Sequence, residues 1–314
     1  MSIAISGSIA FDTIMVFEGR FADHILPDQV QMLNVAFLAP TMRQEFGGCA
    51  ANIAYGLRLL NTDVLVLGAL GSDGEAYLSR LKSLGIDTSA IVEKPDCYTA
   101  QAFITTDLAD NQITAFHPGA MNHAHESQLE GRSPRLGIVS PNGRDAMVQH
   151  AQAFSDRGVP FVFDPGQAMP VFSGEELRQL IRSATWLTVN EYEAEMLCRK
   201  TGLALSDLCE SLQPHPLGGV IATLGAQGAD IHTRGRAPTR VEAMPIGQAV
   251  DPTGCGDAFR AGLLYGLSAQ MSLQRAVCIA AVMGGIKIQS RGGQNHVVTE
   301  TQVLEMVSKH YPFA

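Results

Sequence analysis

The sequence predicts an α/β fold in which a mainly parallel sheet is covered by helices on both faces. Short apolar runs alternate with amphipathic stretches along most of the 314 residues, and such alternation is typical of parallel sheets built from strand–helix–strand units. The chain is also long enough to bury a large core, and its 46% hydrophobic residues are ordinary for a globular protein. We therefore expect a single three-layer α/β/α domain over residues 1–314.

The elements of this domain follow in order along the chain. Strands are expected at the short apolar runs, which are residues 3–8, 64–70, 135–140, 159–164, 186–190 and 219–224. Helices are expected between them, near residues 49–60, 73–84, 144–157, 174–184 and 191–201. Two helix starts carry the Ser-x-x-Glu spacing of a capping box, at Ser72–Glu75 and at Ser173–Glu176.

Two segments depart from this alternation and predict a small lid built of strands. Residues 12–46 form a long irregular segment, and residues 98–117 have the pattern of a hairpin with a turn at residues 107–111. Both leave the main sheet and return to it, so we expect them to project over the ligand cleft beyond the carboxyl ends of the strands. A strand excursion without a gating role is the alternative that the pattern leaves open.

Composition and charge exclude several classes of partner. The net charge of −9 argues against nucleic acid or an anionic membrane as a partner. The six scattered cysteines show no metal-type spacing and favour free thiols in a reducing cytoplasm. The N-terminus lacks the basic region of a signal peptide, and the longest apolar stretch, residues 276–286, is too short to span a bilayer. We expect a soluble, cytoplasmic protein.

The segment Asp251-Pro-Thr-Gly-Cys-Gly-Asp257 predicts an anion site at a helix start. Glycines let backbone N–H groups approach an anion closely, and a helix N-terminus favours negative charge. Phe259, Leu263 and Leu267 then recur every four residues, as in the buried stripe of a helix. A carboxylate at this start could take a proton from a hydroxyl that attacks a held phosphoryl group. Alternatively, Asp257 only caps the helix.

Four further features lie where ligands of such a sheet bind. Gly47-Gly48-Cys-Ala-Ala-Asn52 opens a helix, and Asp12, after the first strand, could accept two hydrogens from a vicinal diol. Asn190-Glu-Tyr-Glu193 starts a helix, where acidic residues pair with the helix dipole or hold Mg²⁺ through water. Thr223-Leu-Gly-Ala-Gln-Gly228 predicts a strand–turn–strand whose amides could reach a nucleotide. Each feature alone is equally explained as an ordinary helix start, loop or turn.

In combination and in this order, the motifs resemble the ribokinase-like (PfkB) family of ATP-dependent carbohydrate and nucleoside kinases, over essentially the whole chain. No Walker A pattern occurs, and Gly68-x-x-Gly71-x-x-Gly74 has the wrong spacing for a dinucleotide fingerprint. Gly7-Ser8-Ile-Ala-x-Asp12, Gly19-Arg-Phe21 and Phe116-His-Pro-Gly-Ala-Met121 resemble bacterial adenosine kinases within that family. The resemblance implies a kinase that phosphorylates the 5′-hydroxyl of a nucleoside, with adenosine preferred. The alternatives are a sugar kinase of the ribokinase or fructokinase type and a non-catalytic nucleoside sensor.

The resemblance also implies a role for each motif. Asp257 would be the general base, and the amides of Gly254, Cys255 and Gly256 would form the anion hole. Glu193 would organise Mg²⁺ around the phosphates of ATP. The residues that would line the ATP site are Asn190, Thr223, Gly225, Gly228 and Thr253. Those that would bind the acceptor are Ser8, Asp12, Gly48 and Asn52, with Gly47-Gly48 as the hinge of the lid. Many family members need K⁺, which would bind near Asp251, Thr253 and residues 290–294.

Two aromatic residues of the expected hairpin suggest how a base is held. Phe103 and Phe116 fall on its two arms, where they could face the cleft and sandwich a flat base. Stacking a base on an aromatic ring is worth roughly 1–3 kcal/mol, which would favour a nucleoside over a free sugar. The alternative is that both rings pack the lid against the main domain. A homodimer is also expected if the lid strands of two chains pair at their edges.

Overall fold

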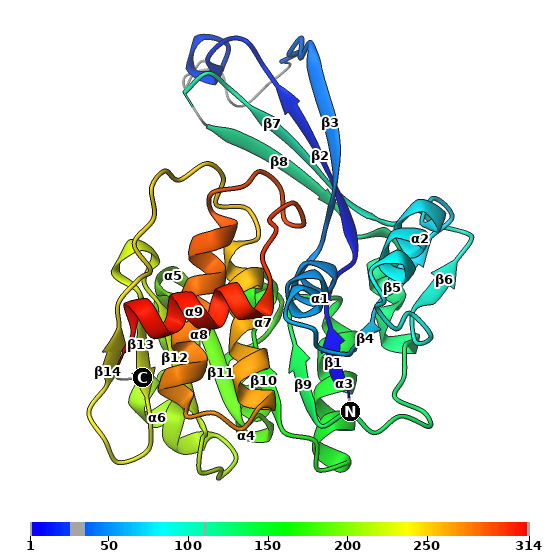
Figure 1. Cartoon of the computed structure of the whole chain (residues 1–314). Helices are drawn as coiled ribbons and strands as arrows, with labels where there is room; N and C mark the ends of the chain where they lie inside the picture. The colour runs from blue at the N-terminus through cyan, green and yellow to red at the C-terminus, as the bar shows by residue number, and fades with distance from the viewer. Residues whose placement is uncertain (1, 26–34, 110, 313–314) are drawn as a thin grey trace.

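An eight-stranded sheet lies at the centre of the computed structural model, which describes residues 2–25, 35–109 and 111–312 (Figure 1). The strands, in spatial order, are β14 (Thr239–Val241), β13 (Ala229–His232), β12 (Gly219–Thr223), β11 (Trp186–Asn190), β10 (Phe161–Phe163), β9 (Leu136–Val139), β1 (Ile3–Ser6) and β4 (Val64–Leu67). The strands from β12 to β4 pair in parallel, whereas β13 and β14 are antiparallel. The expected mainly parallel sheet is therefore confirmed.

Helices cover both faces of this sheet and create two cores (Figure 1). On one face lie α1 (Cys49–Leu59), α7 (Cys255–Ser268), α8 (Leu273–Lys287) and α9 (Glu300–His310). On the other lie α3 (Arg144–Asp156), α4 (Gly174–Ser183), α5 (Glu191–Thr201) and α6 (Leu205–Ser211). Because side chains alternate along a strand, Ile3 and Ile5 join the first core while Ala4 joins the second. No helix in the described part of the chain is long and apolar enough to cross a membrane.

One of the two expected capping boxes is present, and the prediction of the other is wrong. The Ser173 hydroxyl accepts a hydrogen bond from the N–H of Glu176 at the start of α4, and the reciprocal bond is also made. In contrast, α2 (Glu75–Ser83) starts after Gly74, and the hydroxyl of Ser72 donates to the Cys97 carbonyl instead. The cause is the short pair of β5 (Ala69–Gly71) and β6 (Val92–Lys94), which directs the chain after β5 toward residues 97–99 before the helix begins.

A second sheet, formed by the segments predicted to build the lid, projects from the main body (Figure 1). Its spatial order is β3 (Thr41–Gly47), β2 (Ala10–Val16), β7 (Ala100–Thr106) and β8 (Gln112–His117). The arms of the predicted hairpin are thus confirmed, although residues 26–34 of the first lid segment and residue 110 of the turn lie outside the described residues. Short 3₁₀ helices complete the structure at η1 (Phe21–Asp23), η3 (Gly119–Glu126), η4 (Gly166–Val171) and η5 (Gly225–Gln227).

Candidate active site

The turn before α7 presents free backbone donors at its helix start. Gly254 is the N-cap in a left-handed conformation (φ 76°), and a Cβ there would lie 2.9 Å from the Cα of Gly293, so glycine is required on both counts. Among the described residues, the N–H groups of Gly254, Gly256 and Asp257 have no hydrogen-bond acceptor. The N–H of Cys255 is already bonded to the Pro252 carbonyl at 3.1 Å. The N–H groups of Gly254, Gly256 and Asp257 are therefore free to bind an anion, whereas that of Cys255 is not.

The side chain of Cys255 does not act as a nucleophile in this arrangement. Burial raises the pKa of its thiol to about 11, so the thiolate is scarce at neutral pH. Its sulfur donates to the Asp251 carbonyl at 3.8 Å, which directs it back into the turn. The expected role of the Cys255 amide in the anion hole does not fit this arrangement, because that N–H is bonded to the Pro252 carbonyl.

Asp257 lies in the first turn of α7, and its part-buried carboxylate has the side chains of Asn52 and Cys49 as hydrogen-bond partners. The Nδ2 of Asn52 donates to its Oδ2 at 2.8 Å. Burial raises the pKa of Asp257, while the Asn52 hydrogen bond and the charge of Arg260 oppose that rise. A carboxylate whose pKa is raised is a better proton acceptor than an ordinary aspartate, which suits a general base.

Asn52 is itself held by a buried network that the sequence did not reveal. The Nε2 of Gln294 donates to Asn52 Oδ1 at 3.1 Å and contacts the Tyr77 hydroxyl at 3.0 Å. Tyr77 in turn donates to the Gly47 carbonyl, and Arg80 donates to both the side chain and the carbonyl of Gln294 at 3.1 Å. In this structure Asn52 orients Asp257, whereas its binding of acceptor hydroxyls stays a prediction.

Asp12 places a second carboxylate at the edge of the same site. A Cβ on Gly47 would lie 2.3 Å from Asp12 Oδ2, so the carboxylate packs directly on that glycine. Burial, together with the charge of Asp257, raises the pKa of Asp12 to about 6. Ser8 and Gly48 shape the adjacent start of α1, because Ser8 Oγ accepts from the Cys49 N–H at 3.0 Å and Gly48 has a φ of 87°.

A buried ion pair that the sequence analysis missed lies beneath the anion-binding turn. The Arg260 guanidinium, one turn beyond Asp257, makes a bidentate contact with Asp164, with Nη2 at 2.8 Å from Oδ1. Arg260 Nη1 also donates to the Gly256 carbonyl at 3.0 Å. The side chains are only 9% and 2% exposed. The sequence did contain one signal for this site, because Asp164 stands at the carboxyl end of an expected strand, where sheet ligands bind.

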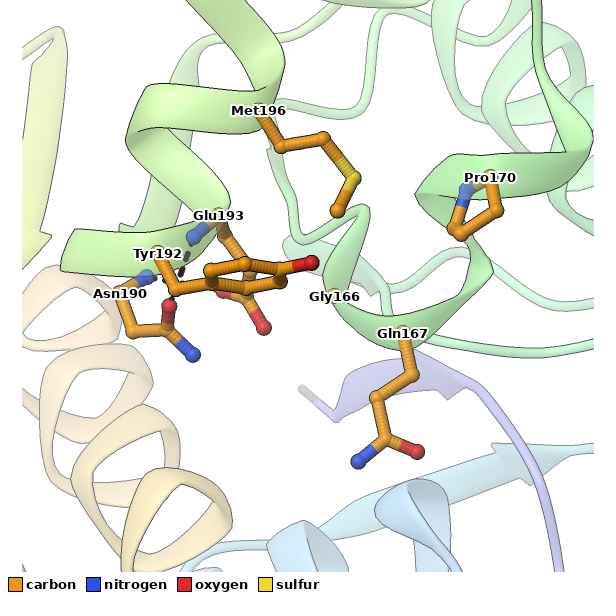
Figure 2. Close-up of a pocket in the computed structure, with 7 residues that line it drawn as sticks. All are labelled: Gly166, Gln167, Pro170, Asn190, Tyr192, Glu193 and Met196. Carbon is orange, nitrogen blue, oxygen red and sulfur yellow. Dashed lines mark hydrogen bonds between the residues drawn. The ribbon is translucent and has the colours of Figure 1, made fainter. Parts of the chain in front are cut away.

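Asn190 and Glu193 form a reciprocal capping box at the start of α5. Glu193 Oε2 accepts from the Asn190 N–H and Asn190 Oδ1 accepts from the Glu193 N–H, both at 2.8 Å. Figure 2 shows these residues facing η4 across a pocket of about 340 Å³. The residues that line this pocket are Gly166, Gln167, Pro170, Asn190, Tyr192, Glu193 and Met196. Burial and the charge of Asp164 raise the pKa of Glu193, so a cation bound here would be stabilised.

The expected strand–turn–strand connects β12 to β13 through η5. Thr223 ends β12, and its hydroxyl donates to the Val189 carbonyl at 3.4 Å. Gly225 and Gly228 have φ values of 55° and 91°. Thr253 belongs to a different segment, the exposed turn before α7, where its N–H donates to Asp251 Oδ1 at 2.9 Å.

The two glycines of this turn should differ in how well they tolerate alanine. A Cβ on Gly228 would lie 2.0 Å from the Val241 carbonyl oxygen, whereas a Cβ on Gly225 would meet nothing within 4 Å. Gly225→Ala should lower the free energy of unfolding by about 1–2 kcal/mol, the cost of a left-handed alanine. Gly228→Ala should lower it by clearly more, since the backbone must also move. Urea unfolding of both variants tests this difference, and equal losses would contradict it.

The expected aromatic sandwich is wrong, because the two rings lie on opposite faces of the lid. In the β7–β8 pair, Phe116 lies opposite Ala102 and Phe103 lies opposite Ala115. Directly opposed residues share a face and neighbours alternate. Asp12 is in register with Ala102, so Phe116 shares the face of Asp12 and Phe103 has the other. Only Phe116 can therefore take part in the site.

Comparison with known proteins identifies the family of this chain. The model of the pfkB family carbohydrate kinases matches residues 14–300. The chain belongs to the pfkB family. Among solved structures of similar fold, the nucleoside kinase of Burkholderia thailandensis in complex with inosine has a TM-score of 0.89 and 44% identity, with 99% of each chain covered.

A second structure of this kinase and one further protein also resemble the chain along nearly its whole length. The same Burkholderia kinase in complex with ADP-inosine has a TM-score of 0.86 and 45% identity, covering 99% of this chain and 97% of the other. A nucleoside kinase of Methanocaldococcus jannaschii is 29% identical, covering 88% of this chain and 90% of its own. The ribokinase-type fold expected from the motifs is thereby confirmed.

Proposed function

We propose that this pfkB protein is an ATP-dependent nucleoside kinase that transfers the γ-phosphate of ATP to the 5′-hydroxyl of a nucleoside. The observation that carries the proposal is the part-buried Asp257 carboxylate, which Asn52 orients beside the free N–H groups of Gly254 and Gly256. A base and an anion site at one helix start suit phosphoryl transfer. Adenosine is the preferred acceptor in this proposal and would yield AMP and ADP, in line with the N-terminal resemblance to bacterial adenosine kinases.

Each residue of the site has a separate role in the proposed reaction. The carboxylate of Asp257 takes the proton of the 5′-hydroxyl as its oxygen attacks the γ-phosphorus and the bond to the β-phosphate oxygen breaks. The N–H groups of Gly254 and Gly256 donate to the transferred phosphoryl group, and each such donor typically contributes about 10²–10³ in rate. Asp12 accepts hydrogens from the ribose hydroxyls. The turn of Gly225 and Gly228 lies at the carboxyl end of β12 and faces the nucleotide.

Mg²⁺ is expected to accompany ATP, and the residues present fit it. Glu193 is partly desolvated and its pKa is raised by burial and by Asp164, so a cation would relieve an unneutralised carboxylate. Mg²⁺ keeps much of its water and is often held by only one or two carboxylates besides the phosphates. When bound, it would neutralise charge on the β- and γ-phosphates, with Glu193 and Asn190 orienting its water.

Phe116 should determine how tightly a nucleoside binds, and Phe103 offers a matched control. Phe116 is 49% exposed on the face of Asp12, so its ring is free to stack on a base. Phe116→Ala should raise the KM for adenosine by about 5–150-fold, equivalent to 1–3 kcal/mol, with a smaller effect on kcat. Phe103→Ala removes a ring of similar exposure from the other face and should leave the KM within about twofold. Equal effects of the two substitutions would contradict this assignment.

An ADP-release assay tests the proposed function directly. Mg-ATP is offered with adenosine, inosine, guanosine, cytidine, ribose and fructose. Turnover of the nucleosides with adenosine fastest supports the proposal. Turnover of the free sugars alone would favour a sugar kinase, and nucleoside binding without turnover would favour a sensor.

We also infer that the protein forms a homodimer through the lid. The edge strand β8 is exposed along its whole length, and Met42, Phe103 and Ile113 share the outer face at 71%, 40% and 43% exposure. Such an edge is a template for pairing with a second chain. Light scattering should give about twice the monomer mass of 33.6 kDa. Ile113→Lys should give the monomer, whereas Val297→Lys, which changes an equally apolar exposed residue outside the lid, should not.

A further inference from the structure

Lys287, the last residue of α8, is completely buried, and the proposed reaction does not use it. Its Nζ donates to the carbonyl oxygens of Asp251 at 2.8 Å and Ser290 at 2.9 Å. Burial lowers the pKa of Lys287, and the negative charge of Asp251 opposes that shift. A buried ammonium costs several kcal/mol unless partners compensate it. Here the two carbonyls and the C-terminal end of α8, where the helix dipole favours a cation, supply that compensation.

The two carbonyls that Lys287 binds belong to the two loops that build the site. Residues 251–256 lead into α7 and carry the anion-binding N–H groups. Residues 288–294 carry Gly293, which packs against Gly254, and Gln294, which holds Asn52. The loops are also joined by the Gly292 N–H, which donates to Asp251 Oδ2 at 2.8 Å. Lys287 therefore holds the anion-binding turn against the loop that orients the general base.

This is the region where the sequence predicted K⁺, and the residues present do not fit that ion. Monovalent cations are bound by groups of carbonyl oxygens. The carbonyls of Asp251 and Ser290 are taken by the ammonium of Lys287. Both carboxylate oxygens of Asp251 accept backbone N–H groups, from Thr253 at 2.9 Å and from Gly292 at 2.8 Å. The oxygens of Asp251 and the carbonyl of Ser290, which would coordinate K⁺, are thus already bonded within the chain.

We propose that Lys287 is a positioning residue, a built-in monovalent cation that fixes the anion-binding turn and makes the reaction independent of added K⁺. The catalytic part of this inference rests on the proposed kinase function. The structural part, that a cation is needed between the two loops, does not depend on it. A thermal-stability measurement can therefore separate a failure of one from a failure of the other.

The first measurement uses the wild-type protein in potassium-free buffer with tetramethylammonium as the only monovalent cation. Adding 100 mM KCl, a concentration on the order of physiological ionic strength, should change kcat by less than twofold. A saturable activation of fivefold or more by K⁺, absent with tetramethylammonium, would overturn the proposal. This measurement needs no variant, so it tests the proposal even if substitution of Lys287 prevents folding.

The second measurement compares two substitutions that differ in the space they leave. Lys287→Ala leaves room for an ion between the loops, whereas Lys287→Met fills the space with an uncharged chain. Both should lower kcat by about 10–100-fold in potassium-free buffer, because a small displacement of catalytic donors costs on the order of 10² in rate. KCl or NH₄Cl should restore at least a tenth of the wild-type kcat to Lys287→Ala, and neither salt should restore Lys287→Met.

The melting temperatures provide the readout that is independent of activity. KCl should raise the Tm of Lys287→Ala more than tetramethylammonium chloride does, and the two salts should act equally on the wild type and Lys287→Met. An equal effect of both salts on Lys287→Ala, with no rescue of kcat, would overturn the proposal. Arg157→Ala is the control, because Arg157 also donates to two backbone carbonyls, of Leu129 and Arg132, and none of these residues belongs to the site. It should keep the wild-type kcat.

Discussion

Asp257→Asn should lower kcat by about 10²–10⁴-fold on the preferred nucleoside while the KM for ATP changes little. The amide keeps the shape of the side chain and can still accept the 2.8 Å hydrogen bond from Asn52, but it cannot take the proton of the acceptor hydroxyl. General-base catalysis typically contributes a factor of this size. Steady-state kinetics with purified protein measures this fall in kcat, with ADP release followed at saturating Mg-ATP.

The stability of the same variant distinguishes lost chemistry from lost structure. Burial raises the folded-state pKa of Asp257 above its unfolded value. Stability is therefore lost as the pH rises above the unfolded pKa, and the whole cost is present once the pH exceeds the folded pKa. Asp257→Asn removes this cost, and its Tm at pH 8 should equal or exceed that of the wild type. A variant that kept more than a tenth of the wild-type kcat would contradict the role of Asp257 as the base.

Asp164→Ala should lower the free energy of unfolding by about 3–5 kcal/mol. The substitution leaves the Arg260 guanidinium buried without its bidentate partner, and losing one member of a buried ion pair has this cost. For a chain of this length that corresponds to a fall in Tm of roughly 5–8 °C. Asp230→Ala is a matched control, because Arg240 also holds Asp230 in a bidentate contact, at 2.7 and 2.8 Å, but on the surface. It should cost about 1 kcal/mol or less.

A double-mutant cycle then shows whether the pair acts as a unit. Arg260→Met alone leaves Asp164 as an unpaired buried carboxylate and should cost as much as Asp164→Ala. The double variant removes both charges, so it should be less destabilised than the sum of the single variants by 1 kcal/mol or more. Additive losses would show that Asp164 and Arg260 stabilise the protein independently. Kinetics of the double variant would also report how far Gly256 depends on the hydrogen bond from Arg260.

The sequence by itself determined the layered α/β fold and the order of the site motifs. Both depend on local properties: alternating apolar runs dictate strands and helices, and a glycine turn before a helix dictates a donor-rich start. The helix after Gly254 and the capping box of Ser173 with Glu176 could be predicted for this reason. The capping box expected at Ser72 failed because pairing of β5 with β6 and hydrogen bonds to residues 97–99 overrode the local signal.

Only the tertiary structure decided which side chains meet. The register of β7 with β8 places Phe103 and Phe116 on opposite faces of the sheet. A shift of this register by one residue would place both rings on the same face. The partners Asp164 for Arg260 and Asp251 for Lys287 lie 96 and 36 residues away in sequence. Contacts over such separations carry no periodic or local signal, because they depend on how the sheet and its loops close in space. The motifs of the candidate site could therefore be found in the sequence alone, whereas the buried charges that lie beside them could not.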